Sequence, residues 1–128
     1  MAGYTINRYN GVFLANIADG TLDTTSTSLS LAGRNYAGYG LYLDSNQVYL
    51  LENFAGSNSP ASPISGQLWY NSTTKLLNVN VATVKGTASA IWKTVAGMTL
   101  SATTPTNAYT GEQWYDTTNG QLKIYTGT

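Results

Sequence analysis

One motif occurs twice in the chain, as Gly66-Gln-Leu-Trp-Tyr-Asn-Ser-Thr-Thr-Lys-Leu-Leu-Asn-Val79 and again as Gly111-Glu-Gln-Trp-Tyr-Asp-Thr-Thr-Asn-Gly-Gln-Leu-Lys-Ile124. The two copies align without a gap at an offset of 45 residues, from residue 66 to residue 111. A fixed period of this size is typical of arrays of small supersecondary units. The repeat therefore predicts two tandem β units, which we place at residues 60–104 and 105–128.

Each unit has the pattern of a strand, a polar turn and a second strand. In the first unit these are 68–70, 71–74 and 76–81, and residues 90–95 add a third strand. The second unit reaches Thr128 before any counterpart of Trp92. A small unit without its third strand has an unpaired edge. We therefore expect either that the native chain continues beyond Thr128 or that a neighbouring subunit supplies the strand.

Before the repeats, residues 1–55 predict a separate N-terminal module. Two alternating stretches, 4–9 and 12–17, flank Asn10-Gly11, which is a strong hairpin signal. Residues 28–31 suggest a short third strand, and a loop that contains several glycines together with Tyr36 and Tyr39 follows.

One helix of about ten residues is expected after this loop. Asp44 or Ser45 would be its cap, Val48, Leu51 and Phe54 would form an apolar stripe, and Gly56 would lie just past its end. Its apolar face should pack on the preceding strands. Residues 56–63 form a polar, proline-bearing linker. The predicted fold class is mainly β, with one short helix followed by tandem β units.

The composition argues against catalysis, because the chain has no His and no Cys. The usual general base, the thiol nucleophile and most transition-metal ligands are therefore missing. We predict a non-enzymatic protein with no metal and no cofactor. The six basic residues form no stripe for phosphate binding, and no apolar run reaches about 20 residues, so neither nucleic acid nor a membrane is an expected partner.

A glycosidase carboxylate pair and a phosphate-binding glycine loop are two less well supported candidate sites. Asp19 and Asp23 would be the pair for a glycosidase, but a glycine turn separates them. Gly33, Gly38 and Gly40 lack phosphate-loop spacing. In the repeats Asp116 aligns with Asn71 and Glu112 with Gln67, and this exchange with neutral residues suits a role in turns.

Five aromatic residues are the candidate binding residues, as subunit or glycan contacts: Trp69, Tyr70, Trp92, Trp114 and Tyr115. Adjacent residues of a strand point to opposite faces. We therefore expect Trp69 and Trp114 in the cores of their units, with each neighbouring tyrosine at an exposed face or a subunit contact. The low charge, 9% of residues, fits a surface that neighbouring molecules cover.

Several stretches resemble virion structural, tail-fibre-like proteins of tailed phages that infect marine cyanobacteria. They are residues 5–31, 33–40, 50–55 and 63–71, together with the Gly-Glu-Gln-Trp-Tyr-Asp repeat that ends at Asp116. Residues 41–46 are more apolar than that pattern, and 82–90 form an irregular insert. The resemblance implies a place in the virion, with residues 1–55 as an attachment module and the repeats as the start of a shaft. It also implies assembly in the host cytoplasm, baseplate, tail or capsid proteins as partners, and a homotrimer. A part beyond Thr128 would contact a host surface glycan.

Three functions follow as expectations. The first is the N-terminal part of a tail fibre or baseplate-attached fibre, which anchors the host-adhesion apparatus. The second is a capsid-associated decoration or head-fibre protein. The third is a free-standing carbohydrate-binding module.

Overall fold

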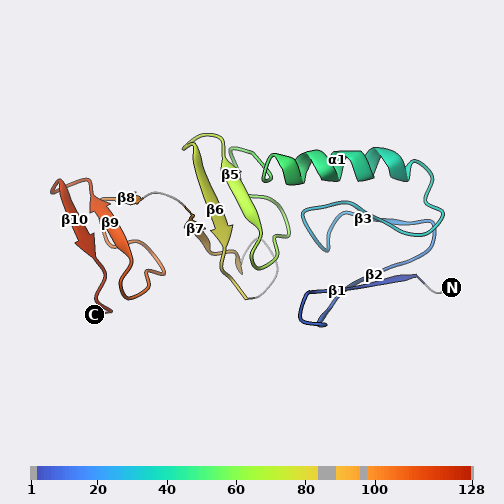
Figure 1. Ribbon diagram of the computed structural model, residues 1–128, viewed down its shortest axis with the longest axis horizontal. Helices are drawn as coiled ribbons and strands as arrows, with labels where there is room; N and C mark the ends of the chain where they lie inside the picture. The colour runs from blue at the N-terminus through green and yellow to red at the C-terminus, as the bar shows by residue number, and fades with distance from the viewer. Residues whose placement is uncertain (1–2, 84–88, 96–97, 128) are drawn as a thin grey trace.

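Small β-sheets follow one another along the long axis of the molecule, and one helix lies beside the sheet that residues 22–23 and 31–32 form (Figure 1). The computed structural model describes residues 3–83, 89–95 and 98–127. Its described part has sheets of two or three strands. This confirms the predicted mainly β fold with a single short helix.

The N-terminal hairpin forms as predicted. Strand β1 (Tyr4–Asn7) pairs antiparallel with β2 (Phe13–Ile17), with a bulge between Ile6 and Asn7. The Asn10 Oδ1 atom accepts a hydrogen bond from the backbone N–H of Val12 at 3.1 Å. Gly11 has a φ of 78°, which a glycine adopts without steric cost. The Asn-Gly pair therefore supplies both the side-chain bond and the backbone angle that the turn needs.

A second small sheet follows, in which β3 (Leu22–Asp23) pairs antiparallel with β4 (Leu31–Ala32). The strand expected at residues 28–31 is therefore shorter and lies later. Gly33 follows β4, and a Cβ atom at this position would come within 2.0 Å of the Ala18 carbonyl oxygen. This close approach brings the second sheet against the end of the hairpin, beside Ile17, which is 2% exposed.

The helix α1 (Tyr39–Leu51) begins earlier than predicted. Gly38 precedes it in the left-handed conformation, with a φ of 79°, and no side chain caps its first turn. Asp44 and Ser45, the expected caps, lie inside the helix. The helix ends before Phe54, since Asn53 and Phe54 both have a φ of 52°. The prediction of the helix was right, but its bounds were wrong, because a backbone glycine rather than a polar side chain starts it.

The first repeat unit is a three-stranded antiparallel sheet in the order β5-β6-β7. Its strands are β5 (Leu68–Asn71), β6 (Leu76–Asn80) and β7 (Trp92–Thr94). Leu68 pairs with Val79, and Asn80 pairs with Trp92. The predicted strand–turn–strand unit with a third strand is therefore present. Of the insert expected at 82–90, residues 84–88 lie outside the described part of the chain.

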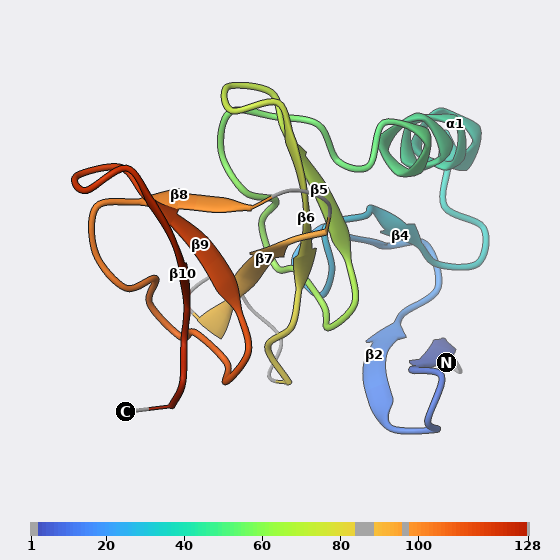
Figure 2. The ribbon, with the colours of Figure 1, turned by 60° about the vertical axis from the view of Figure 1, so that its left-hand side comes forward.

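The second unit repeats this hairpin with the same register. Strand β9 (Gln113–Asp116) pairs antiparallel with β10 (Gln121–Ile124), and Gln113 faces Ile124 as Leu68 faces Val79. In both views the two hairpins stand side by side with their turns at the same end (Figures 1 and 2). The two copies of the motif therefore form the same local structure.

An additional strand, β8 (Thr99–Ser101), lies parallel to β9 and completes the sheet β10-β9-β8. The sequence did not predict it. Its residues fall within the range 60–104 assigned to the first unit, yet they pair with the second. Gly56 forms a parallel bridge with Asn71 at the place that corresponds to Ser101 and Asp116. Each hairpin therefore receives a parallel segment from the chain before it.

Candidate assembly surface

The described residues hold no cluster of three or more metal-ligating side chains. None of the described helices is long and apolar enough to cross a membrane.

Asp23 is occupied within its own turn. Its Oδ1 atom accepts hydrogen bonds from the backbone N–H groups of Thr25, at 2.8 Å, and Ser26, at 3.0 Å. Its Oδ2 atom accepts one from the Ser26 hydroxyl at 2.5 Å. The Ser26 hydroxyl and these N–H groups hold the pKa of Asp23 well below its usual range. The Asp23 carboxylate thus stabilises its own turn.

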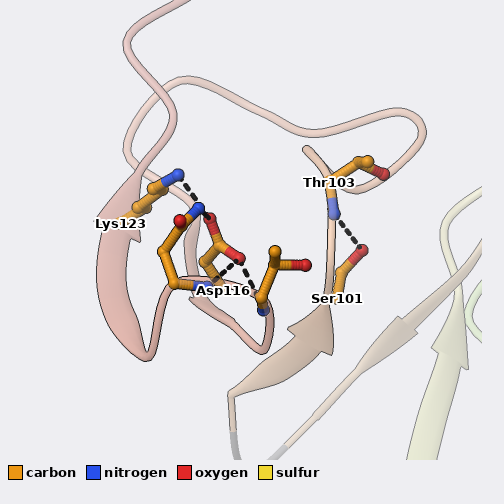
Figure 3. Close-up of polar contacts among 6 residues, drawn as sticks. Ser101, Thr103, Asp116 and Lys123 are labelled. Atoms are coloured by element: carbon orange, nitrogen blue, oxygen red, sulfur yellow. Dashed lines mark hydrogen bonds and ion pairs between the residues drawn. The ribbon is translucent and has the colours of Figure 1, made fainter.

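Asp116 organises the turn between β9 and β10 (Figure 3). Its Oδ1 atom accepts hydrogen bonds from the N–H groups of Thr118, at 2.9 Å, and Asn119, at 3.1 Å. Its Oδ2 atom accepts from the ammonium group of Lys123 and from the Asn119 side chain. The Lys123 bond, followed by that of Asn119, lowers the pKa of Asp116.

The first unit builds the same turn without a charge. Asn71 Oδ1 accepts from the N–H groups of Thr73, at 2.9 Å, and Thr74, at 3.1 Å. Asn71 and Asp116 therefore accept equivalent hydrogen bonds from the backbone of their turns. The ion pair with Lys123 occurs only in the second unit, because Asn78 is the counterpart of Lys123 in the first.

Lys93 joins the two units. Its ammonium group lies 2.7 Å from the Glu112 Oε2 atom and 2.6 Å from the Asn107 carbonyl oxygen, and 4.9 Å from the centroid of the Tyr109 ring. Burial raises the pKa of Glu112, but the bonds from Lys93 and the Tyr109 N–H outweigh burial, and the pKa falls below its usual value. A charged side chain of the first sheet thereby contacts the loop that joins β8 to β9 in the second sheet.

The N-terminal module meets the first unit at the corresponding place. Gln67, the counterpart of Glu112, donates a hydrogen bond from Nε2 to the Ser28 hydroxyl at 2.8 Å. That hydroxyl donates to the Ala61 carbonyl oxygen at 2.6 Å. Gln67 also accepts from the Ile64 N–H, as Glu112 accepts from the Tyr109 N–H. Each unit thus presents one polar socket, centred on Gln67 or Glu112, to the part of the chain before it. Neither Ser28 nor Lys93 was predicted from the sequence as a partner in these contacts.

The five candidate aromatic residues do not form one platform. Trp69 and Trp92 pack edge to face, with ring centroids 5.4 Å apart, and the Trp69 indole N–H donates to the Gly56 carbonyl oxygen. Trp114 is 7% exposed, while Tyr115, on the opposite face of β9, is 37% exposed. Tyr70 is half-buried. The three tryptophans thus lie mainly within the sheets, and Tyr115 is the most exposed member of the set.

The indole nitrogens of Trp92 and Trp114 are buried and have no hydrogen-bond partner among the described residues. In the first unit the carbonyl of Gly56 serves this purpose for Trp69. Each unit therefore contains one buried indole N–H without a partner among the described residues, that of Trp92 in the first and that of Trp114 in the second.

The helix α1 carries much of the exposed apolar surface. None of its 13 residues, all within the described part, is buried. The inner side faces β4 and carries Asn46. The Asn46 side chain accepts a hydrogen bond from the N–H of Ser30, the residue before β4, at 3.0 Å and donates one to the Ser30 carbonyl oxygen at 2.7 Å. On the outer side Leu41 is 70%, Val48 49% and Leu51 82% exposed. A helix that is apolar on all sides is normally buried.

Leu41, Val48 and Leu51 share one face of α1, because they are separated by seven and then three residues. With Asp44 between them, they have the spacing of the contact seam in helices that pack side by side. We call this set the outer face of α1.

A cleft of about 550 Å³ separates the N-terminal module from the first unit, and apolar side chains dominate its lining: Ile6, Leu14, Leu29, Leu31, Leu50, Phe54, Ile64 and Leu68. A second cleft of about 620 Å³ lies between the two units, beside Lys93 and Leu122. Apolar packing between successive modules is therefore incomplete within one chain.

Few of the described residues are buried, and the buried apolar side chains among them are Ala15, Ile17, Pro63, Ala82 and Trp114. The chain exposes 8151 Å². A compact monomer of 13.7 kDa would expose about 6,600 Å². The chain thus exposes about 1,500 Å² more than a compact monomer would, and its shape is extended (Figure 1). Its exposed apolar side chains include those of the outer face of α1. The surface most suited to an interaction is therefore an apolar assembly surface.

Comparison of the chain with protein-family models, with curated proteins and with solved structures finds no match in any of the three.

Proposed function

We propose that this protein is a structural component of a tailed-phage particle, the N-terminal part of a tail fibre or baseplate-attached fibre that acts as a homotrimer. The observation that carries the assembly part of the proposal is the outer face of α1, where Leu41 and Leu51 are 70% and 82% exposed. The place in a virion rests on the resemblance of the sequence to tail-fibre-like proteins.

The area of exposed surface supports assembly with copies of the same chain. The chain exposes about 1,500 Å² more than a compact monomer of its mass would, and Leu41 and Leu51 of α1 are part of this exposed surface. The chain is neutral, so its copies do not repel one another by net charge. Apolar packing between copies would cover the helix, which a single chain leaves open.

The arrangement of the units supports a rod. Each unit receives the preceding part of the chain through the same socket, at Gln67 and at Glu112. Stacking of this kind extends a molecule in one direction, and each repeat depends on its neighbours for stability. A shaft that projects from an attachment module has this construction.

Sedimentation equilibrium tests the assembly part. A mass of three times 13.7 kDa is expected at micromolar concentration. A stable monomer would contradict the proposed assembly, and a dimer or hexamer would contradict the proposed trimer.

Cryo-electron microscopy of the virion tests the location. Threefold density at the tail or baseplate is the expected result. Density on the shell would replace the fibre with a decoration or head-fibre protein.

A free-standing carbohydrate-binding module is less well supported. Flat aromatic faces suit sugar rings, but Trp114 is buried and Trp69 packs against Trp92. Saccharide affinity that disappears in Trp69→Ala with the fold unchanged would revive this function.

A further inference from the structure

The sequence contains two Asn-Gly pairs, and both lie in hairpin turns. Asn10-Gly11 joins β1 to β2, and Asn119-Gly120 joins β9 to β10. All four residues are exposed. An asparagine followed by glycine can react with its own backbone, because glycine has no side chain to obstruct the approach of its nitrogen. The dipeptide is the same in both turns, but the hydrogen bonds around it differ.

We propose that Asn10 is a site of spontaneous deamidation and that Asn119 is protected from the same reaction. The backbone nitrogen of Gly11 loses its proton to a base in solution and attacks the Asn10 Cγ atom. The N–Cγ bond forms, the Cγ–Nδ2 bond breaks, and the amide nitrogen takes up a proton and leaves as ammonia. Water then opens the resulting cyclic succinimide at Cγ, which gives aspartate, or at the main-chain carbonyl carbon, which gives isoaspartate. The proposal does not depend on the function proposed above.

The contacts of Asn10 favour the attack. The Val12 N–H donates a hydrogen bond to the Asn10 Oδ1 atom at 3.1 Å. The same N–H would stabilise the negative charge that develops on Oδ1 when Cγ becomes tetrahedral, as hydrogen-bond donors do for the oxyanion in acyl transfer. Among the described residues the Asn10 Nδ2 atom has no hydrogen-bond partner, so no such bond has to break before ammonia leaves.

The contacts of Asn119 oppose the attack. Its Nδ2 atom donates to the Asp116 Oδ2 atom at 2.8 Å, and its backbone N–H donates to Asp116 Oδ1 at 3.1 Å. A hydrogen bond to a carboxylate is stronger than one between neutral groups, and this one must break before ammonia leaves. The two bonds also hold the side chain and the backbone of Asn119 in place, so Cγ cannot turn towards the Gly120 nitrogen while both are intact.

The attacking nitrogens themselves do not distinguish the two turns. The Gly11 N–H donates to the Arg8 carbonyl oxygen at 3.0 Å, and the Gly120 N–H donates to the Asp116 carbonyl oxygen at 2.8 Å. Each turn must therefore open at this bond before its glycine can react. The side-chain bonds of Asn10 and Asn119 account for the expected difference in rate.

The two products at residue 10 should affect the hairpin differently. Aspartate keeps an oxygen for the Val12 N–H, as the Asp23 and Asp116 carboxylates accept from N–H groups of their own turns. Isoaspartate adds a methylene group to the main chain of the turn that the Arg8 N–H closes by donating to the Val12 carbonyl oxygen at 2.8 Å. We therefore expect isoaspartate, and not aspartate, to weaken the pairing of β1 with β2.

The test follows deamidation of the full 128-residue chain in mildly alkaline buffer, with and without concentrated urea. Peptide mapping by mass spectrometry gives the rate of conversion of amide to acid at each asparagine. In the folded chain Asn10 should react at least about tenfold faster than Asn119, because the bond to the carboxylate has to break. In urea the two rates should agree within about twofold, because the turns are lost.

Asp116→Asn is the matched variant for the protection of Asn119. An asparagine at 116 can accept the backbone bonds of the turn, as Asn71 does, but offers no second oxygen to the Asn119 amide. Asn119 should then react at least about threefold faster, while the rate at Asn10 stays unchanged. Circular dichroism checks that the variant is folded.

The outcomes separate the two parts of the proposal. Equal rates in the folded chain, or a faster reaction at Asn119, would overturn it. A folded chain that remains intact at Asn10 while the urea-treated chain reacts there would overturn the assignment of Asn10. An unchanged rate at Asn119 in folded Asp116→Asn would overturn the protective role of the carboxylate.

Discussion

At the scale of single residues, the two copies of the hairpin turn differ in one instructive position. Lys75 has a φ of 62° where its counterpart Gly120 has a φ of 65°. The left-handed conformation costs a residue with a Cβ atom about 1 kcal/mol or more. The first unit therefore carries backbone strain that the second avoids.

This difference predicts opposite effects of two reciprocal substitutions. Lys75→Gly should raise the free energy of unfolding by about 0.5–1 kcal/mol, and Gly120→Lys should lower it by a similar amount. Urea denaturation followed by tryptophan fluorescence measures both. Destabilisation by Lys75→Gly would mean that the lysine side chain stabilises the folded protein by more than its left-handed backbone conformation costs.

The ion pair of Asp116 with Lys123 predicts a pH dependence. The folded-state pKa of Asp116 is lowered, so its contribution to stability is present above about pH 4 and is lost as the pH falls below it. Asp116→Asn keeps the turn bonds, as Asn71 shows, but removes the charge. The melting temperature of Asp116→Asn should lie below that of the wild type at pH 7, and the gap should close towards pH 2.

A control separates the charge from the turn. Asp116→Ala, which removes both, should lower the melting temperature further than Asp116→Asn at pH 7. If the two variants have the same melting temperature, the hydrogen bonds from the Thr118 and Asn119 N–H groups contribute nothing to stability in the second unit.

Gly33 predicts a steric effect in the N-terminal module. A Cβ atom at this position would meet the Ala18 carbonyl oxygen at 2.0 Å, so Gly33→Ala should destabilise the protein by about 2 kcal/mol or more. Gly40→Ala is the matched control, because open space surrounds Gly40 within α1 and alanine favours helices by up to about 1 kcal/mol. Thermal unfolding by circular dichroism should shift in opposite directions in the two variants.

At the scale of elements, substitutions on the outer face of α1 should affect assembly without affecting folding. Replacement of both Leu41 and Leu51 by glutamine removes apolar area from the outer face of α1 without loss of a buried contact. The double variant should sediment as a monomer of 13.7 kDa with an unchanged circular dichroism spectrum. Gln47→Ala, an exposed position on the same helix, should leave the mass of the assembly unaltered. Assembly of the double variant at wild-type concentration would place the interface elsewhere.

The elements also show how far the sequence predicts the structure. The hairpins were predictable because Asn10-Gly11 and the repeated Trp-Tyr motif are local signals. The start of α1 was not, since Gly38 begins it through its backbone angle while Asp44 and Ser45 resemble caps. Strand β8 was missed because it has only three residues and its parallel partner lies beyond the next loop.

The candidate site was predictable only in part. The aromatic residues stand out by their repetition, and the burial of Trp114 follows from strand alternation. The socket contacts of Ser28 and Lys93 depend on residues far apart in the chain, 39 positions for Ser28 and Gln67, and a single sequence gives no signal for such pairs.

At the scale of the whole molecule, Lys93 and Glu112 couple the two units. Their side chains are 16% and 20% exposed, so solvent screens the pair less than a surface ion pair. A double-mutant cycle with Lys93→Met and Glu112→Gln should give a coupling free energy of about 1 kcal/mol. The coupling should fall as salt rises. A coupling free energy of zero would mean that other contacts hold the units together.

The socket has a consequence for how such a chain changes length over generations. It accepts a serine hydroxyl at Gln67 and a lysine at Glu112, and the hairpin behind it is the same in both cases. An in-frame duplication of residues 68–112 would give each copy of Lys93 a copy of Glu112 and would leave Ser28 beside Gln67. Such a duplication would lengthen the molecule by one whole unit while the first module keeps its own contacts.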